Sequence, residues 1–172
     1  IRERMAKPID PCWRRTGALL ALLCVGAAAP ADPPPRRPFP QHVTYAPGTL
    51  RPVHRSQLGQ DDDVRALYQA WRSRYLADAG LGSSGQPRFR VRYSRAVDAP
   101  TVSEGQGYGM VVVALMAGED PQAQVLFDGL LEFALDHSSR VDGRLMDWYV
   151  AGDEGPDPFG DVSAFDGDAS IA

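Results

Sequence analysis

The stretch that decides the fold lies in the middle of the chain and reads Thr101-Val102-Ser103-Glu104-Gly105-Gln106-Gly107-Tyr108-Gly109-Met110. It sets one acidic side chain, Glu104, at the start of an apolar run, which predicts the first turn of a helix over residues 104–117. Its three glycines each cost a helix about 1 kcal/mol relative to alanine. We therefore expect a neighbouring helix or the ring of a substrate to lie against this backbone.

Helical spacing of apolar residues continues on both sides of this stretch. Val64, Leu67, Tyr68, Trp71 and Tyr75 predict a helix that opens at the acidic triplet 61–63 and ends at Gly80. Asp120-Pro121 is typical of a helix start and predicts a helix to about residue 136. Residues 163–172 have the pattern of a further helix. The predicted fold class is all-α, with the polar residues in the loops.

One segment has the period of a strand instead. Phe89, Val91 and Tyr93 alternate with Arg88, Arg90 and Arg92, which predicts a short strand or extended segment with one basic face. A basic and aromatic face can bind nucleic acid. The acidic balance of the rest of the chain argues against that interpretation.

The first 31 residues have the composition of a secretory leader. Arg14-Arg15 precedes an uncharged apolar run over 18–29, and Ala29-Pro30-Ala31 offers small residues at a cleavage site. We predict a signal peptide over 1–31, with Met5 as its start and 1–4 as upstream sequence. A membrane anchor is the alternative, but the run is shorter than the ~20 residues that a span needs. The predicted location is secreted or periplasmic.

After the leader, residues 32–60 are rich in proline and predict an extended linker or arm. The leader holds five of the 18 basic and two of the 22 acidic residues, which leaves a formal charge of −7. Such a surface disfavours nucleic acid. Both cysteines, Cys12 and Cys24, lie in the leader, so we predict no disulfide and no cysteine metal site. The histidines lack metal-ligand spacing, and we expect neither metal nor cofactor.

Two acidic sites carry the candidate chemistry, Glu104 and the Asp166-Gly167-Asp168 knot. Acid/base hydrolysis of a glycosidic bond requires two separated carboxyl groups. Each site also has a purely structural alternative. Glu104 fits a capping box that begins at Thr101, and Ser103 fits one with Gln106; both aspartates could cap a helix. Trp148 is either a core residue or a platform on which a sugar stacks.

Four motifs in this order resemble glycoside hydrolase family 8: Ser103-Glu104-Gly105-Gln106-Gly107-Tyr108-Gly109-Met110, Phe127-Asp128-Gly129-Leu130, Gly143-Arg144-Leu145-Met146-Asp147-Trp148 and Ala164-Phe165-Asp166-Gly167-Asp168-Ala169-Ser170-Ile171-Ala172. The resemblance covers about residues 60–172, so 61–172 is expected to be the N-terminal part of a catalytic domain. It implies a partial (α/α)6 barrel, truncated before closure. It also implies a secreted enzyme that cleaves β-1,4-linked polysaccharides with inversion.

The resemblance assigns roles to three residues. Glu104 matches the general acid, and Asp166 matches a residue described as nucleophile-like or as the holder of the central sugar. Trp148 is similar to a cleft tryptophan that stacks on sugars. The chain departs from the family pattern at Phe165, where serine or threonine is usual. The family's general base, an aspartate well downstream, is absent, so the fragment itself is expected to be inactive.

The expected substrate is cellulose or another β-glucan, and the resemblance leaves xylan and chitosan open. Apart from the polysaccharide, the chain is expected to be a monomer with no nucleic-acid partner and no membrane contact after leader cleavage. The alternative from another class is a non-catalytic helical carbohydrate-binding or structural module. In such a module, Glu104 and Asp166 would only cap helices.

Overall fold

The computed structural model describes residues 39–159 and 162–172. These residues all belong to one compact unit, Pro34–Ala172. The predicted leader over 1–31 lies outside the described residues. Within the described ranges, no helix is both long enough and apolar enough to cross a membrane.

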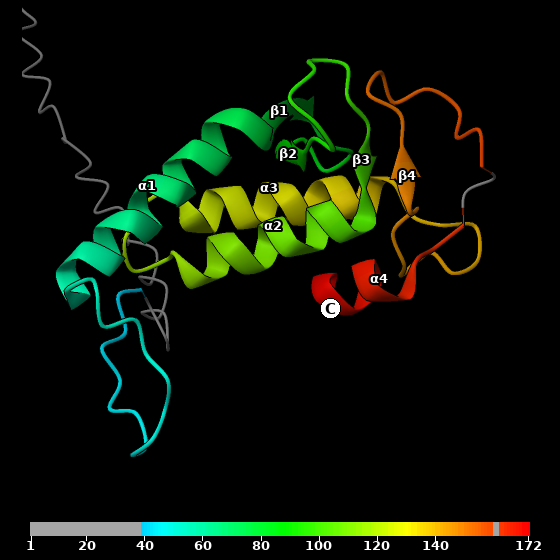
Figure 1. Cartoon of the computed structure of the whole chain (residues 1–172). Helices are drawn as coiled ribbons and strands as arrows, with labels where there is room; N and C mark the ends of the chain where they lie inside the picture. The colour runs from blue at the N-terminus through cyan, green and yellow to red at the C-terminus, as the bar shows by residue number, and fades with distance from the viewer. Residues whose placement is uncertain (1–38, 160–161) are drawn as a thin grey trace, which may run out of the picture. The chain divides into compact units, whose positions relative to one another are not determined.

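Helices form most of the regular structure, and four short strands accompany them (Figure 1). In chain order, the elements are α1 (Gln57–Tyr75), β1 (Leu76–Leu81), β2 (Pro87–Val91), β3 (Thr101–Val102), α2 (Ser103–Leu115), α3 (Ala123–Asp136), β4 (Tyr149–Val150) and α4 (Phe165–Ile171). The prediction of an all-α chain is therefore too simple. The chain is rich in helix, but two antiparallel strand pairs, β1–β2 and β3–β4, connect its helices.

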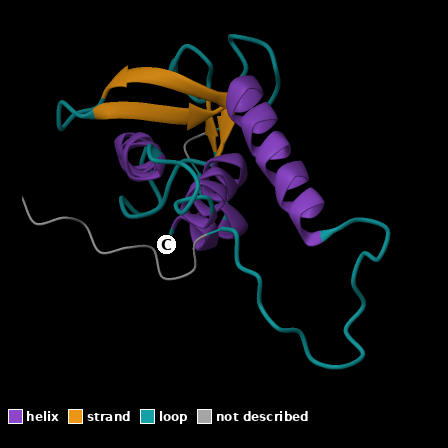
Figure 2. Cartoon of the chain, turned by 90° about the vertical axis from the view of Figure 1, so that its left-hand side faces the viewer, coloured by secondary structure: helices purple, strands orange, loops and turns teal. Residues whose placement is uncertain are grey.

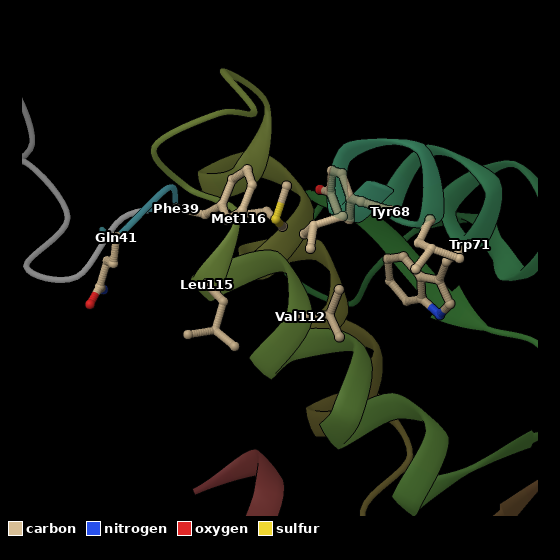
Figure 3. Close-up of a pocket in the computed structure, with 9 residues that line it drawn as sticks. Phe39, Gln41, Tyr68, Trp71, Val112, Leu115 and Met116 are labelled. Carbon is tan, nitrogen blue, oxygen red and sulfur yellow. The ribbon is translucent and has the colours of Figure 1, made fainter. Parts of the chain in front are cut away.

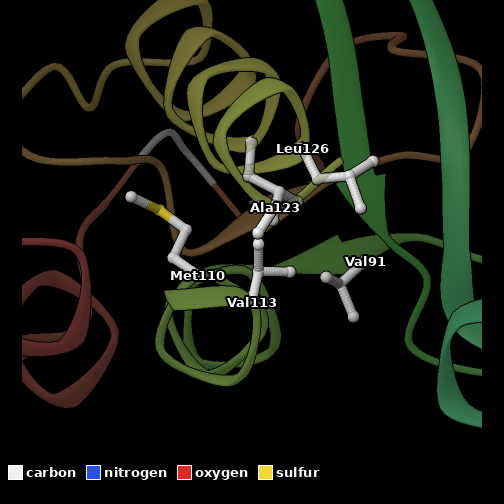
Figure 4. Packing of buried hydrophobic residues seen from close by; sticks show 6 residues of the cluster. Val91, Met110, Val113, Ala123 and Leu126 are labelled. Carbon is white, nitrogen blue, oxygen red and sulfur yellow. The ribbon is translucent and has the colours of Figure 1, made fainter. Parts of the chain in front are cut away.

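The main core lies between α2, α3 and β2. Val91 of β2, Val113 of α2 and Leu126 of α3 converge there, as Figure 4 shows, and all three are buried. Leu130 is fully buried in the same cluster. Burying such side chains is the main favourable term in folding, at roughly 25 cal/mol per Å² of apolar surface. This core fixes the position of α2, whose first turn carries Glu104.

Helix α1 ends earlier than its sequence indicates. The helix predicted to run to Gly80 stops at Tyr75, and the next six residues form β1. Strand β1 pairs antiparallel with β2, from Leu76 opposite Val91 to Leu81 opposite Pro87 (orange in Figure 2). The predicted strand around Phe89 is confirmed as β2. Because β2 needs a partner for its backbone hydrogen bonds, the residues before Gly80 form a strand beside β2 instead of continuing α1.

The arginines of β2 do not form a free basic face. Arg88 bonds to Asp136 and Glu154 through Nη1 and Nη2, at 3.2 and 3.1 Å. Arg90 is buried and donates to the carbonyl of Ala99 at 2.6 Å. Arg92 donates to the carbonyl of Arg74 at 2.8 Å. Arg88 is thus paired with carboxylates and Arg90 is buried, so the three arginines do not share one exposed face.

The glycines of α2 permit close contact with other parts of the chain. A Cβ at Gly107 would lie 2.6 Å from the Cβ of Ser170 in α4, and one at Gly109 would overlap Val91. The backbone is therefore covered by α4 and β2, which decides between the two neighbours that the sequence left open. Ser103 also contacts Gly167, so α2 and α4 run in parallel with their first turns at the same end.

Candidate active site

The first turn of α2 presents Glu104 without using it as a cap. The N-cap residue is Val102, which makes no side-chain capping bond, so Glu104 is the second residue of the helix. Neither predicted capping box forms. Thr101 lies in β3, where its hydroxyl oxygen accepts from Arg90 at 3.3 Å, and Ser103 is inside the helix. Glu104 is partly buried.

Gln106 attaches this turn to β2 and α3. Its side chain is fully buried, and its amide oxygen accepts from the backbone N–H of Val91 at 2.9 Å. Its amide nitrogen donates to the carbonyls of Phe89 and Leu130, at 3.1 and 2.8 Å. A buried amide with three bonds fixes α2 against β2 and α3, since losing any one would leave a polar group unsatisfied. The sequence suggested only a capping role for Gln106, so this role was missed.

The carboxylate of Glu104 has one hydrogen-bond partner among the described residues, the hydroxyl of Ser103, with Oγ 3.5 Å from Oε2. In the same part of the chain, no lysine or arginine forms an ion pair with it. A carboxylate at the N-terminus of a helix is favoured by the helix dipole. This one long contact is to Oε2, and the other oxygen, Oε1, has no partner among the described residues.

Asp166 and Asp168 have different surroundings. The N-cap residue of α4 is Ala164, with no side-chain capping bond, so neither aspartate caps this helix. Asp168 accepts a hydrogen bond from the backbone N–H of Met146 at 2.9 Å and so fixes α4 to the preceding loop. Asp166 is exposed in the first turn. Its side chain has no bonding partner within the described ranges.

A close contact between the two helices brings the acidic turns together. A Cβ added to Gly167 would lie 2.6 Å from the Cβ of Ser103. Glu104 follows Ser103 and Asp166 precedes Gly167, so the two acidic residues flank the same contact. Both also lie at helix N-termini that face the same way. The arrangement suits chemistry that needs two carboxyl groups near one ligand.

Trp148 lies beside this contact. Its carbonyl accepts from the backbone N–H of Ser103 at 3.0 Å, and the next residue, Tyr149, pairs with Val102 across β3–β4. The half-buried indole packs against the rings of Phe159 and Tyr149, with centroids 5.0 and 5.7 Å away. The structure therefore places the backbone of Trp148 next to Ser103, and its partly buried side chain in an aromatic cluster. The contribution of Phe159 was not visible in the sequence.

Nothing in the described ranges brings three or more histidine, cysteine, aspartate or glutamate side chains together as a metal site. The groups that the structure places in this region are carboxyl groups, one hydroxyl and aromatic rings.

An apolar groove lies elsewhere, between α1 and the C-terminal end of α2. It has a volume of about 690 Å³ and is lined by Phe39, Tyr68, Trp71, Leu115 and other, mostly apolar, side chains (Figure 3). The arm before α1 borders it, since the backbone N–H of Phe39 donates to the carbonyl of Leu115 at 3.0 Å. Sugars need several polar partners as well as a ring to stack on. The described residues that line the groove include no carboxylate, so Glu104 and Asp166 mark the better candidate site.

Comparison with known proteins gives a consistent result. The model of the family described as glycosyl hydrolases family 8 matches residues 53–172. A beta-glucanase of Niallia circulans is 40% identical over 157 residues, which cover 89% of this chain and 35% of that protein. An endoglucanase of Bacillus sp. (strain KSM-330) is 39% identical over 139 residues, which cover 79% and 30%.

A solved structure is also similar. It is the apo structure of a beta-1,3-1,4-glucanase from Paenibacillus sp. X4, with a TM-score of 0.69 and 39% sequence identity. The match covers 80% of this chain and 34% of that one. The chain thus spans about a third of the length of the relatives that it matches.

Proposed function

We propose that this chain, which belongs to glycosyl hydrolases family 8, supplies the acid-bearing part of an enzyme that hydrolyses β-1,4 bonds in β-glucans. The observation that carries the proposal is the contact between Ser103 and Gly167, beside which Glu104 and Asp166 stand together. In this proposal, the helices of the chain are part of an (α/α)6 barrel that further helices complete.

Glu104 acts as the general acid. Its carboxyl group gives a proton to the oxygen that bridges two sugars while the bond from that oxygen to the anomeric carbon breaks. Asp166 binds the sugar on the non-reducing side of the bond and helps to distort it. The partly accessible face of Trp148 stacks on a neighbouring sugar. These roles need no cofactor.

Inversion requires a second carboxylate that activates water on the opposite face of the sugar. In inverting enzymes this base lies about 6.5–9.5 Å from the acid. Because Asp166 holds the sugar, we assign the base to a part of the enzyme outside these 172 residues. The chain alone is accordingly expected to be inactive.

The substrate proposal follows the relatives. They are named beta-glucanase, endoglucanase and beta-1,3-1,4-glucanase, all of which point to glucose polymers. Xylan and chitosan stay as alternatives, to be decided by the relative rates on the three polymers. The leader pattern favours secretion or export to the periplasm, and we propose that the enzyme works as a monomer.

The competing module without catalytic activity assigned capping roles to Glu104 and Asp166. Neither side chain caps its helix. Both residues stand in the first turns of their helices, and their carboxyl groups have no cation to neutralise them within the described part of the chain. A purely structural role gives no reason to place two acidic residues without cation partners beside the same helix contact.

The test is reducing-sugar release from soluble β-glucan by the complete natural protein that contains this chain. Glu104→Gln keeps the size of the side chain but removes its acid, and we expect turnover to fall by at least about 100-fold. Glu119→Gln is the matched control, because it makes the same change just beyond the other end of α2, where Glu119 pairs with Arg65. Undiminished turnover in Glu104→Gln would refute the proposed role.

A further inference from the structure

Ser103 is buried but does not cap α2, which is the role that its capping box predicted. It has no exposed surface, and it is the first residue of α2 rather than its cap. Its backbone N–H donates to the carbonyl of Trp148 at 3.0 Å. The partner of its hydroxyl is Oε2 of Glu104 at 3.5 Å. A buried hydroxyl costs free energy unless it makes a hydrogen bond, so its presence beside a carboxyl group needs a reason.

Packing against Gly167 explains the size of this side chain but not its polarity. The Cβ and the Oγ of Ser103 both stand in front of Gly167, where an added Cβ would lie 2.6 Å from the Cβ of Ser103 and closer still to its Oγ. A larger residue at position 103 would force α2 and α4 apart. The helix contact therefore uses an atom at the Oγ position, but it does not require that atom to be polar.

We propose that Ser103 is a positioning residue for Glu104, an inference that rests on the function proposed above. Its hydroxyl donates to Oε2 of the carboxyl group and so leaves the acidic proton on Oε1, the oxygen free to meet a substrate. During bond cleavage this proton moves from Oε1 to the bridging oxygen, which keeps the electron pair of the broken bond. Ser103 then stabilises the carboxylate that is left.

The distance between the hydroxyl of Ser103 and the carboxyl group of Glu104 is long. Hydroxyl bonds to oxygen are usually 2.5–3.0 Å long, and the 3.5 Å between Oγ of Ser103 and Oε2 of Glu104 is longer than that. Hydrogen bonds in active sites are often long in the free enzyme and shorten when substrate binds. Ser103 is well placed for this change, because its backbone is held by Trp148 and its Cβ by Gly167.

The test compares Ser103→Ala with Thr101→Val in the complete natural protein. Thr101 is equally buried and only two residues away, but its hydroxyl oxygen accepts from Arg90 and does not meet Glu104. Each variant is assayed on a β-glucan oligosaccharide, whose leaving group needs a proton. Each is also assayed on a 2,4-dinitrophenyl β-cellobioside, whose leaving group departs without one.

For Ser103→Ala we expect kcat on the oligosaccharide to fall about tenfold, with KM unchanged and kcat on the dinitrophenyl substrate within about twofold of the unmodified protein. Thr101→Val should not separate the two substrates. If Ser103→Ala slows both substrates equally or slows neither, Ser103 has only a packing role and the inference is overturned.

Glu104→Gln, assayed in parallel, separates this outcome from failure of the proposed function. If it turns over the oligosaccharide normally, the function falls, and the role of Ser103 falls with it. If it is inactive on the oligosaccharide while Ser103→Ala treats both substrates alike, only the role of Ser103 is lost.

Discussion

Gly107 of α2 lies directly against Ser170 of α4, close enough that a Cβ on the glycine would be 2.6 Å from the Cβ of the serine and 2.9 Å from the carbonyl oxygen of Gly167. Because backbone atoms form part of this contact, a side-chain rotation cannot relieve the overlap. The two acidic turns keep their relative position only while the contact is intact.

Gly107→Ala should therefore destabilise the protein by about 1–3 kcal/mol, the usual cost of overpacking, even though alanine favours helix. Urea unfolding followed by circular dichroism measures the change. Gly143→Ala is the matched control, because a Cβ at Gly143 meets no atom within 4 Å. A Gly107→Ala protein that is as stable as the control would show that α4 does not pack on α2 in this way.

Asp120 connects the start of α3 to α1. Its buried carboxylate accepts from the hydroxyl of Tyr68 at 2.5 Å and from Arg72 at 2.8 Å. Burial and this carboxylate raise the pKa of Tyr68, which keeps the phenol protonated. Asp120→Ala would leave both donors without their acceptor, and we expect a loss of about 3 kcal/mol in unfolding free energy.

Asp142→Ala provides the comparison for Asp120, because it breaks an ion pair with Arg144 that is open to solvent. Exposed pairs contribute little to stability. The expected order of unfolding midpoints is unmodified protein, then Asp142→Ala close behind, then Asp120→Ala far below. The reverse order would contradict the role of Asp120 in joining the start of α3 to α1.

Stability should depend on pH through Asp136. Burial raises the pKa of its carboxyl group, but the hydroxyl and amide of Ser83 and the charge of Arg88 outweigh burial, and the pKa lies below its ordinary value. A group with a lowered pKa stabilises the fold above its unfolded value, about 3.9 for aspartate. This contribution is lost as pH falls through the folded value.

Asp136→Asn should accordingly be less stable than the unmodified protein near pH 7, and the gap should close below about pH 4. Urea midpoints measured between pH 2.5 and 7 provide the check. Ser83→Ala, which removes one donor to the same carboxylate, should reduce the pH-dependent part of the stability. A gap of constant size at all pH values would rule out this linkage.

Asp166 is exposed and bonds to nothing else through its side chain in the described ranges, so its removal should not unfold the protein. If it binds a sugar, Asp166→Ala should lower kcat/KM on β-glucan about 10- to 100-fold with no change in the unfolding midpoint. Asp128→Ala is the control, since Asp128 is an exposed aspartate on α3 whose one side-chain partner among the described residues is Gln124. Equal kinetics in the two variants would remove Asp166 from the site.

The sequence predicted the helices well where their apolar residues face one core. Helices α2 and α3 lie close to their predicted ranges, because Val113 and Leu126 face the same cluster. The main error of the prediction from sequence was at the end of α1. The stretch before Gly80 favours helix locally but pairs with β2 in the folded chain. Pairing between distant segments overrides local preference, and no local pattern reports it.

In the candidate site, too, local motifs identified residues, but contacts between distant residues determined their arrangement. Glu104 and Asp166 could be named from their motifs, and the glycines indicated that something covers α2. That α4 covers it, and that the carbonyl of Trp148 receives the N–H of Ser103, depends on contacts between residues more than 40 positions apart. Ser103 was missed from the sequence because a capping box predicts an N-cap role for it. In the structure, Ser103 lies inside α2, next to Glu104.

The most direct test of the central claim is a crystal structure of the complete Glu104→Gln protein with a bound β-1,4-linked glucose tetrasaccharide. We predict that the side chain at position 104 lies within about 3.2 Å of a bridging oxygen, with Asp166 bonded to the sugar before it and the Trp148 ring against a neighbouring sugar. A tetrasaccharide bound away from position 104, for example in the groove beside Phe39 and Leu115, would contradict the account.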